Sequence, residues 1–329
     1  MLGDLKRTLQ ESLFELPPRV APAEPRVEYA EIAERLPPTV RLGTMSWAFE
    51  GWRGIVYSST SEAKRLSHEG LPAYSAHPLL RAVEIDRSFY EPLPAAAFTH
   101  FASQVPPDFR FVVKAHEETT LLRFPDHARY GKKRGTSNSR FLEASYATDQ
   151  VVGPASEGLG EKLGTLLFQF PPQSLGEPRR FADALESFFA GLPRGIPYTV
   201  EIRNAELLTA AYGAALARSG VMHCHNVWGP MPDVREQARQ LPRDVRQRLI
   251  VRWLLRPGDT YEGARSRFLP FNRLVEEDGT TRASIVELVA RAVSFDVPTL
   301  VLVNNKAEGS APLSLFRIAE ALVARSPQN

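Results

Sequence analysis

Tyr198-Thr-Val-Glu-Ile-Arg203 is a short run of strand-forming apolar residues that ends in charged side chains. Seven other runs of the same kind occur along the chain, at 40–46, 82–86, 109–116, 164–169, 221–226, 249–252 and 299–305. A buried strand rarely ends in Glu, Lys, Arg or Asn unless that end faces a site. The eight polar ends therefore predict a ring of functional groups around the mouth of a barrel.

Segments with helical patterns separate these runs, clearly at 95–104, 177–190, 205–219, 233–249, 284–294 and 314–324, and more weakly at 59–80 and 136–152. Strands separated by helices pair in parallel, because a crossover must return the chain to the start of the next strand. Eight repeats over about 290 residues predict an α/β fold, a TIM-like (β/α)8 barrel slightly above its typical size. Gly158-Leu-Gly-Glu-Lys-Leu-Gly164 precedes its strand, so it is not a dinucleotide-binding fingerprint.

Residues 1–38 differ from the rest of the chain. Five leucines follow a helical spacing and are then followed by prolines: Leu2, Leu5, Leu9, Leu13 and Leu16, then Pro17, Pro18, Pro22 and Pro25. This pattern predicts an N-terminal extension, a short amphipathic helix and a Pro-rich linker laid over the outside of the barrel. The alternative is a tail that binds a partner. Residues 39–329 then form the single barrel domain.

The composition, 43% hydrophobic and 24% charged residues, is that of a soluble globular protein. A net charge of +2 gives no global indication of nucleic acid or of an anionic membrane as partner. Cys224 is the single cysteine, which excludes an internal disulfide and suits a reducing compartment. No run approaches the roughly 18 apolar residues of a membrane helix, and the first residues lack the pattern of a secretion signal. We expect a cytoplasmic protein.

The polar residues of the runs fall into pairs two positions apart, which share one face of a strand. These pairs are Glu84 with Asp86, Lys114 with His116, Glu201 with Arg203, and His223 with His225. Parallel barrel strands place such ends at the C-terminal rim, where (β/α)8 enzymes carry their sites. The predicted site contains catalytic Glu84, Lys114 and Glu201, together with ligand-binding Gln169, Arg203, Arg252, Asn304 and Asn305.

Two interpretations of the acids and cations remain open. Glu84 and Glu201 could pair with Lys114 and Arg203 as a purely structural ion network. Alternatively, two carboxylates with separated pKa values would act as general acid and base, while the cations hold an anionic substrate. A desolvated Lys114 could itself act as a base.

Aromatic residues follow the first two strands, namely Trp47, Trp52 next to Arg53, and Tyr90. They could be ordinary packing beneath a loop, or a platform on which a base or sugar ring stacks. With Lys132-Lys133-Arg134 tracking phosphates, the same residues would bind nucleic acid without catalysis. The segment 131–135 is then either a solvated loop or a basic flap over an anionic ligand.

His223-Cys-His225 has the spacing of a metal pair, which is weak evidence because a polar layer of the barrel explains it equally well. Together with His116, Glu84 and Glu201, His225 would complete a His/carboxylate site for a divalent metal. We predict no cofactor, and we retain a metal site at His116 and His225 as the alternative.

Six motifs in order resemble the YecE-like family, known as domain of unknown function 72. They are Gly43–Trp47 with Trp52–Gly54, Val83–Tyr90, Phe109–Lys114, Leu163–Pro172, Val200–Arg203 and Val303–Asn305. The resemblance covers about residues 40–325 and implies a TIM-like barrel. The likeness of that family to endonuclease IV-type and sugar-isomerase-type barrels suggests nucleic acid or carbohydrate ligands, an analogy of fold alone.

The chain departs from the pattern of this family at three places. Ser46 stands where the family commonly has glycine, Leu121 replaces a histidine, and Trp253 follows Arg252 where a histidine and glycine are usual. The leading hypothesis is an enzyme of hydrolase or isomerase type acting on a phosphate- or sugar-containing anion. The alternatives are a nucleic-acid-binding module and a metal-dependent hydrolase of endonuclease IV-like type.

Overall fold

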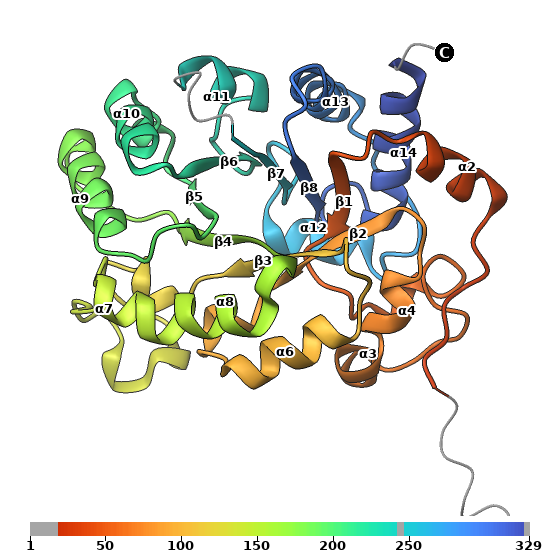
Figure 1. Cartoon of the computed structure of the whole chain (residues 1–329), viewed down its shortest axis with the longest axis horizontal. Helices are drawn as coiled ribbons and strands as arrows, with labels where there is room; N and C mark the ends of the chain where they lie inside the picture. Colours follow the sequence, from red (N-terminus) through yellow and green to blue (C-terminus); the bar gives the residue numbers. More distant parts are fainter. Residues whose placement is uncertain (1–18, 242–246, 326–329) are drawn as a thin grey trace, which may run out of the picture.

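Eight parallel strands close into a barrel in chain order, so the predicted (β/α)8 fold is confirmed (Figure 1). The computed structural model describes residues 19–241 and 247–325. The strands are β1 (Val40–Thr44), β2 (Leu80–Ile85), β3 (Arg110–Lys114), β4 (Leu163–Phe170), β5 (Tyr198–Ile202), β6 (Met222–Val227), β7 (Leu249–Trp253) and β8 (Thr299–Val303). β1 pairs with β8 from Val40 opposite Thr299 to Thr44 opposite Val303, which closes the barrel.

Helices form a ring around the barrel (Figure 1). The α-helices are α2 (Val27–Arg35), α3 (Ala63–Glu69), α4 (Leu71–Ser75), α5 (Arg87–Tyr90), α6 (Ala95–Ser103), α7 (Ala144–Ala147), α8 (Gly153–Leu159), α9 (Pro178–Ala190), α10 (Ala210–Ser219), α11 (Val234–Gln240), α12 (Tyr261–Phe268), α13 (Gly279–Val293) and α14 (Ala311–Arg325). The short 3-10 or π turns are η1 (Glu50–Trp52), η2 (Glu117–Thr119), η3 (Ala128–Lys133), η4 (Thr148–Val152), η5 (Gly160–Lys162) and η6 (Ala205–Leu207).

The predicted helix over 233–249 is shorter in the structure, because α11 ends at Gln240 and Leu241 is already extended. Capping chemistry explains where other helices begin. The Glu177 carboxylate accepts hydrogen bonds from two backbone N–H groups of the first turn of α9, and Pro178 occupies its first position. Thr209 caps α10, which ends at Gly220 in the left-handed region.

Strand alternation divides the barrel into an apolar interior and a polar end. Small and aliphatic side chains fill the interior, namely Ala82, Val112, Leu167, Cys224, Ile250, Leu300 and Leu302. Their strand neighbours point outward and pack against the helices; Val83 and Ile85 flank the inward Glu84 in this way. The charged layer at Glu84, Glu201 and Arg252 lies above the apolar interior, toward the C-terminal ends of the strands. The apolar filling therefore supports the candidate site from below.

The N-terminal segment contains a helix that the sequence analysis missed. α2 packs on α14, where the Tyr29 ring lies 4.5 Å from the Phe316 ring, although Tyr29, Ile32 and Ala33 have helical spacing in the sequence. Pro22 forms an isolated bridge with Tyr57, so this part of the extension lies on the barrel. The helix predicted over 2–16 falls outside the described residues. No helix within 19–241 or 247–325 is long and apolar enough to cross a membrane.

Close contact between β1 and β2 predicts that Gly43→Ala destabilises the barrel. A Cβ atom at Gly43 would lie 2.1 Å from the Ala82 carbonyl oxygen, and backbone cannot yield as a flexible side chain can. We expect a loss of about 1–3 kcal/mol or more in the free energy of unfolding, measured by urea denaturation. The control is Gly279→Ala at the start of α13, where a Cβ meets nothing within 4 Å. Equal stability of the two variants would refute this steric argument.

Candidate functional site

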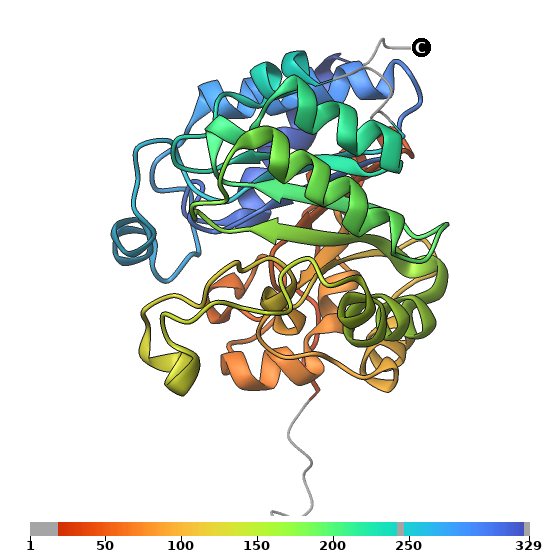
Figure 2. The ribbon, with the colours of Figure 1, turned by 90° about the vertical axis from the view of Figure 1, so that its left-hand side faces the viewer.

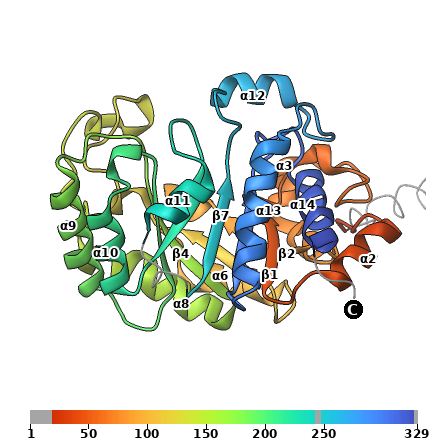
Figure 3. The ribbon, with the colours of Figure 1, turned by 90° about the horizontal axis from the view of Figure 1, so that it is seen from above.

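A cavity of about 330 Å³ opens at the C-terminal mouth of the barrel, and we call it the central cavity. Its volume is typical of small-molecule sites. Polar side chains from the strand ends line it: Glu84, Asp86, Lys114, Gln169, Arg203, Arg252 and Asn304. Residues from the segments that follow the strands form its rim, among them Phe89, Tyr90, Glu117, Arg129, Tyr130, Trp228 and Tyr261. Figures 2 and 3 show α12 and the loop that carries η3 projecting on the same side of the barrel.

A buried ion triad forms the floor of the central cavity. Arg252, only 1% exposed, pairs its Nη2 with Glu84 Oε2 at 2.8 Å, and its Nη1 contacts Glu201 Oε2. Removing these groups from water is costly, and close pairing offsets that cost. The three residues come from β2, β5 and β7, so the triad also ties these strands together.

The two carboxylates of the triad have opposite pKa shifts. Burial is the largest influence on Glu84 and raises its pKa, against the lowering effect of Arg252 and Lys114. Burial would also raise the pKa of Glu201, but Arg252 and Arg203 outweigh it and lower that pKa to about 2. Glu201 is completely buried and does not line the cavity, whereas Glu84 does. Glu201, predicted to be catalytic, therefore lies outside the lining of the cavity and pairs with Arg203 and Arg252.

Arg203 lies at the end of β5 and is held in place on three sides. Its Nε donates to Glu201 Oε1 at 2.9 Å, and its Nη2 donates to Gln169 Oε1 at 2.9 Å. The guanidinium also lies 4.2 Å from the centre of the Trp228 ring. Since the Gln169 oxygen accepts from Arg203, the N–H groups of that amide remain as donors. Both predicted residues thus present fixed donors at the cavity.

Lys114 reaches the cavity from the end of β3. Its Nζ donates to Asp86 Oδ1 at 2.6 Å and lies 3.8 Å from the centre of the Phe89 ring. Ser88 Oγ donates to the Lys114 carbonyl at 2.7 Å, which fixes α5 against β3. Lys114 is 6% exposed, so its ammonium group meets a ligand only through the cavity.

Aromatic side chains surround the mouth of the central cavity and cover cations. Arg129 lies 5.2 Å from the Tyr90 ring centre and 4.4 Å from that of Tyr130. Lys306 Nζ lies 4.1 Å from the Tyr261 ring centre. Tyr90 and Tyr261 are 56% and 50% exposed, so ring surface remains for a ligand. Only Tyr90 of these residues was predicted. The others lie in η3, at the start of α12 and after the end of β8, where no strand pattern marks them.

The central cavity is balanced in charge, whereas the sequence analysis considered cations free to hold an anionic substrate. Each cation that lines it pairs with a carboxylate: Lys114 with Asp86, Arg129 with Glu117, Arg203 with Glu201, and Arg252 with both Glu84 and Glu201. Asn304 lines the cavity as predicted, with its Oδ1 accepting from the Lys306 backbone N–H at 3.0 Å. Neutral polar and charged ligand atoms can therefore both find partners here.

Four residues predicted to bind ligand lie outside the central cavity, namely Trp47, Trp52, Arg53 and Asn305. Trp52 is completely buried and donates from Nε1 to Asn305 Oδ1 at 3.2 Å. The same Asn305 oxygen accepts from the Ala311 backbone N–H at 2.8 Å, so both residues secure the start of α14. Arg53 is exposed on the turn after η1 and lines none of the described cavities.

Trp47 is buried beside Phe101, with the two ring centres 5.6 Å apart, and lines a neighbouring cleft instead. The structure therefore does not assemble Trp47, Trp52 and Tyr90 into one stacking platform. The basic segment 131–135 is also engaged locally, because Lys133 pairs with Glu118 at 2.6 Å and Arg134 with Asp126 at 2.5 Å. Local pairing favours the interpretation of this segment as a solvated loop.

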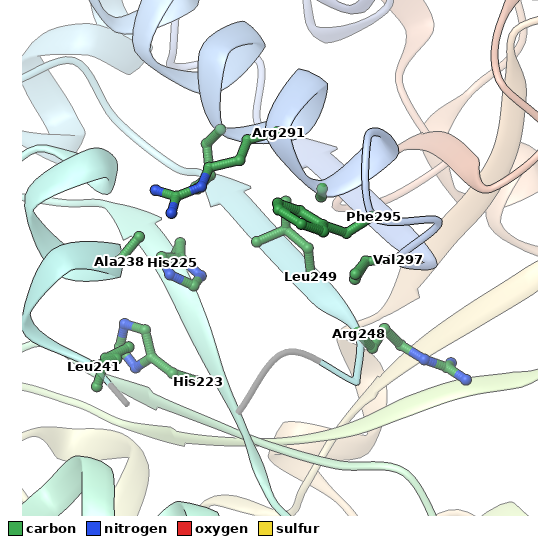
Figure 4. Close-up of a pocket in the computed structure, with 11 residues that line it drawn as sticks. His223, His225, Ala238, Leu241, Arg248, Leu249, Arg291, Phe295 and Val297 are labelled. Atoms are coloured by element: carbon green, nitrogen blue, oxygen red, sulfur yellow. The ribbon is translucent and has the colours of Figure 1, made fainter. Parts of the chain in front are cut away.

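The two histidines of β6 face away from the candidate site. Cys224 occupies the inward position, with its Sγ 3.7 Å from Glu201 Oε2, so alternation turns His223 and His225 outward. His223 bonds Tyr212 at 2.9 Å and Gln237 at 3.1 Å, and burial lowers its pKa to about 4. Figure 4 shows both histidines in a small pocket with Leu249 and Phe295, beside α11 and α13.

The predicted metal set is not assembled. His116 Nδ1 bonds the Tyr146 hydroxyl at 2.7 Å and does not line the central cavity, and His225 lies outside the barrel. Glu84 and Glu201 are occupied by Arg252. In the part of the chain that the structure describes, no three His, Cys, Asp or Glu side chains come together as metal ligands.

We predict that Glu201→Gln destabilises the fold in a pH-dependent way. It leaves buried Arg252 short of one carboxylate, so we expect a loss of about 3–5 kcal/mol near neutral pH. The lowered pKa of Glu201 stabilises the folded state above its ordinary value of 4.5, and this contribution is lost as the pH falls toward 2. Urea denaturation at a series of pH values measures this effect. The difference in the free energy of unfolding between wild type and Glu201→Gln should become smaller as the pH falls from 4.5 toward 2. A difference independent of pH would contradict the assignment.

Comparison with known proteins agrees with this architecture. A family model described as protein of unknown function DUF72 matches residues 41–329. The UPF0759 protein YunF of Bacillus subtilis (strain 168) is 32% identical over 123 residues, which span 37% of this chain and only 38% of YunF.

The crystal structure of a DUF72 family protein of Enterococcus faecalis V583 superposes with a TM-score of 0.61 at 17% identity, covering 88% of this chain and 97% of that one. A second, of Thermotoga maritima MSB8, gives a TM-score of 0.59 at 20% identity, covering 86% and 98%. The chain belongs to the DUF72 family.

Proposed function

We propose that the protein is an enzyme that acts on a sugar-containing anionic small molecule in the central cavity. The observation that carries this proposal is the environment of Glu84. This carboxyl group lies at the floor of a cavity of ligand size, and its partner Arg252 is shared with a second acid. Fixed donors at Lys114 and Arg203 lie around the same space.

The balance of charge in the cavity favours a ligand rich in hydroxyl groups. A sugar hydroxyl both donates and accepts, so it can use carboxylates, amides and cations together. The exposed rings of Tyr90 and Tyr261 offer flat apolar surface for the faces of a sugar ring. A ligand that is only anionic would gain little from cations that are already paired.

The two acids of the triad take different roles in this proposal. Glu84 transfers the proton, because its raised pKa brings it closer to the neutral range in which a general acid works well. Glu201 stays ionised and positions Arg252 and Arg203. Lys114 and Arg203 stabilise negative charge that develops on a substrate oxygen. Hydrolysis and isomerisation of a sugar both need such proton transfer, so these are the reaction types we propose.

Glu84→Gln should abolish turnover while retaining binding. Wild type and variant are incubated with a panel of aldoses, ketoses and their phosphate esters, and conversion is followed by NMR. Loss of a general acid lowers the rate about 10²-fold or more. The control is Glu118→Gln, a buried glutamate paired with Lys133 and Arg140 away from the cavity lining. Absence of turnover across the whole panel by wild type, or full activity of Glu84→Gln, would refute the proposal.

Lys114→Met should weaken ligand binding. The variant removes one charge-assisted donor worth about 1.5–3 kcal/mol, so affinity falls roughly ten-fold or more in calorimetric titration. Lys132→Met is the matched control, because Lys132 is exposed on the 131–135 loop and does not line the central cavity. If both variants bind the sugar ligand as tightly as wild type, Lys114 has no part in recognition.

A further inference from the structure

A second cavity of about 420 Å³, here called the side cleft, adjoins the central cavity. The two cavities share three lining residues, Met45, Glu84 and Asp86. The remaining lining of the side cleft comes from the loop after β1, from the end of β2, and from α3, α5 and α6. It includes Ser46, His68, Ile85, Arg87 and His100. A ligand that occupies the central cavity can thus extend past Glu84 and Asp86 into a separate space.

In the described part of the chain, the side cleft is lined by a cation that has no ion-pair partner, which the central cavity lacks. Its two acids are already engaged, Glu84 with Arg252 and Asp86 with Lys114. Arg87 is exposed and has no ion-pair partner in the described part of the chain. His68 and His100 also line the cleft, and their imidazoles make no hydrogen bond to another side chain within 19–241 and 247–325.

The donors of the side cleft suit a tetrahedral oxyanion. Arg87, His68 and His100 belong to three different helices, α5, α3 and α6, so they can approach one group from different sides. A guanidinium offers paired donors in a plane that match phosphate oxygens, and each imidazole adds a further donor. The Ser46 hydroxyl supplies another polar group next to the central cavity.

We infer that the side cleft is the subsite for the anionic group of the substrate, a phosphate ester, held by Arg87 with His68 and His100. This inference rests on the proposed function, since the sugar part of the same molecule would lie over Glu84 in the central cavity. The two cavities would then recognise different parts of the substrate. The charge-balanced central cavity binds the hydroxyl groups, and the side cleft distinguishes a phosphorylated sugar from its neutral parent.

The first test compares ribose with ribose 5-phosphate by calorimetric titration of the full chain. Wild type should bind the phosphate ester more tightly. Arg87→Met should lose roughly ten-fold or more in affinity for the ester and leave the affinity for ribose unchanged. Lys114→Met should weaken both ligands by a similar factor. Arg53→Met is the matched control, because Arg53 is an exposed arginine outside both cavities.

The second test adds inorganic phosphate alone to the wild-type protein, and variants serve only to assign the signals. In NMR spectra of protein labelled at its seven histidines, phosphate should shift the imidazole signals of two of them, His68 and His100. Single His68→Gln and His100→Gln variants assign those signals. Carboxylate ions at equal concentration should cause smaller shifts, and equal shifts would point to a carboxylate ligand instead of a phosphate.

The outcomes separate this inference from the proposed function. If Arg87→Met keeps the preference for ribose 5-phosphate and Lys114→Met loses it, the anion lies in the central cavity; the inference fails while the proposed function stands. Unmoved His68 and His100 signals at about 20 mM phosphate would also overturn the inference. If neither sugar binds wild type while phosphate still shifts both signals, the subsite stands and the sugar assignment fails.

Discussion

The buried pairing of Arg252 with Glu84 and Glu201 is the constraint on which the rest of the candidate site depends. A guanidinium at 1% exposure is tolerated only where carboxylates surround it, and here they come from β2 and β5 while the arginine comes from β7. The same Glu201 holds Arg203, and Arg203 in turn orients Gln169 and lies against Trp228. One ion network therefore fixes strand positions and the donors of the cavity together.

This network also shifts the pKa values of Glu84 and Glu201 in opposite directions. Glu201 gains enough from Arg252 and Arg203 to stay ionised despite complete burial, whereas burial prevails at Glu84 and raises its pKa. Two carboxylates that share one arginine can thus have pKa values shifted in opposite directions, because they differ in their other neighbours. The apolar interior below, formed by residues such as Val112, Leu167 and Ile250, keeps water away from the floor of the cavity. The polar end of the barrel is accordingly a preorganised surface on a rigid base.

Much of the barrel and part of the site could be predicted from local pattern. Short strands that end in polar residues predict the fold, because period-two alternation is a local property. They also predict which side chains lie at the strand ends, namely Glu84, Lys114, Gln169 and Arg203. The same alternation shows that His223 and His225 share a face but not which face, since that depends on closure of the sheet. Rim residues such as Arg129 and Tyr261 come from η3 and from the start of α12, in long connections after the strands whose course no local periodicity fixes.

The sequence by itself determined the eight-fold repeat, the parallel order of the strands and the polar ends that lie at one rim, because these follow from hydrophobic periodicity and connection length. Tertiary structure alone decided which cations are neutralised, that Trp52 and Asn305 secure α14, and that Glu84 lines a cavity while the buried Glu201 does not. The physical reason is that burial and charge pairing depend on residues far apart in the chain, as Glu84, Glu201 and Arg252 are, and only the closed barrel brings them into contact.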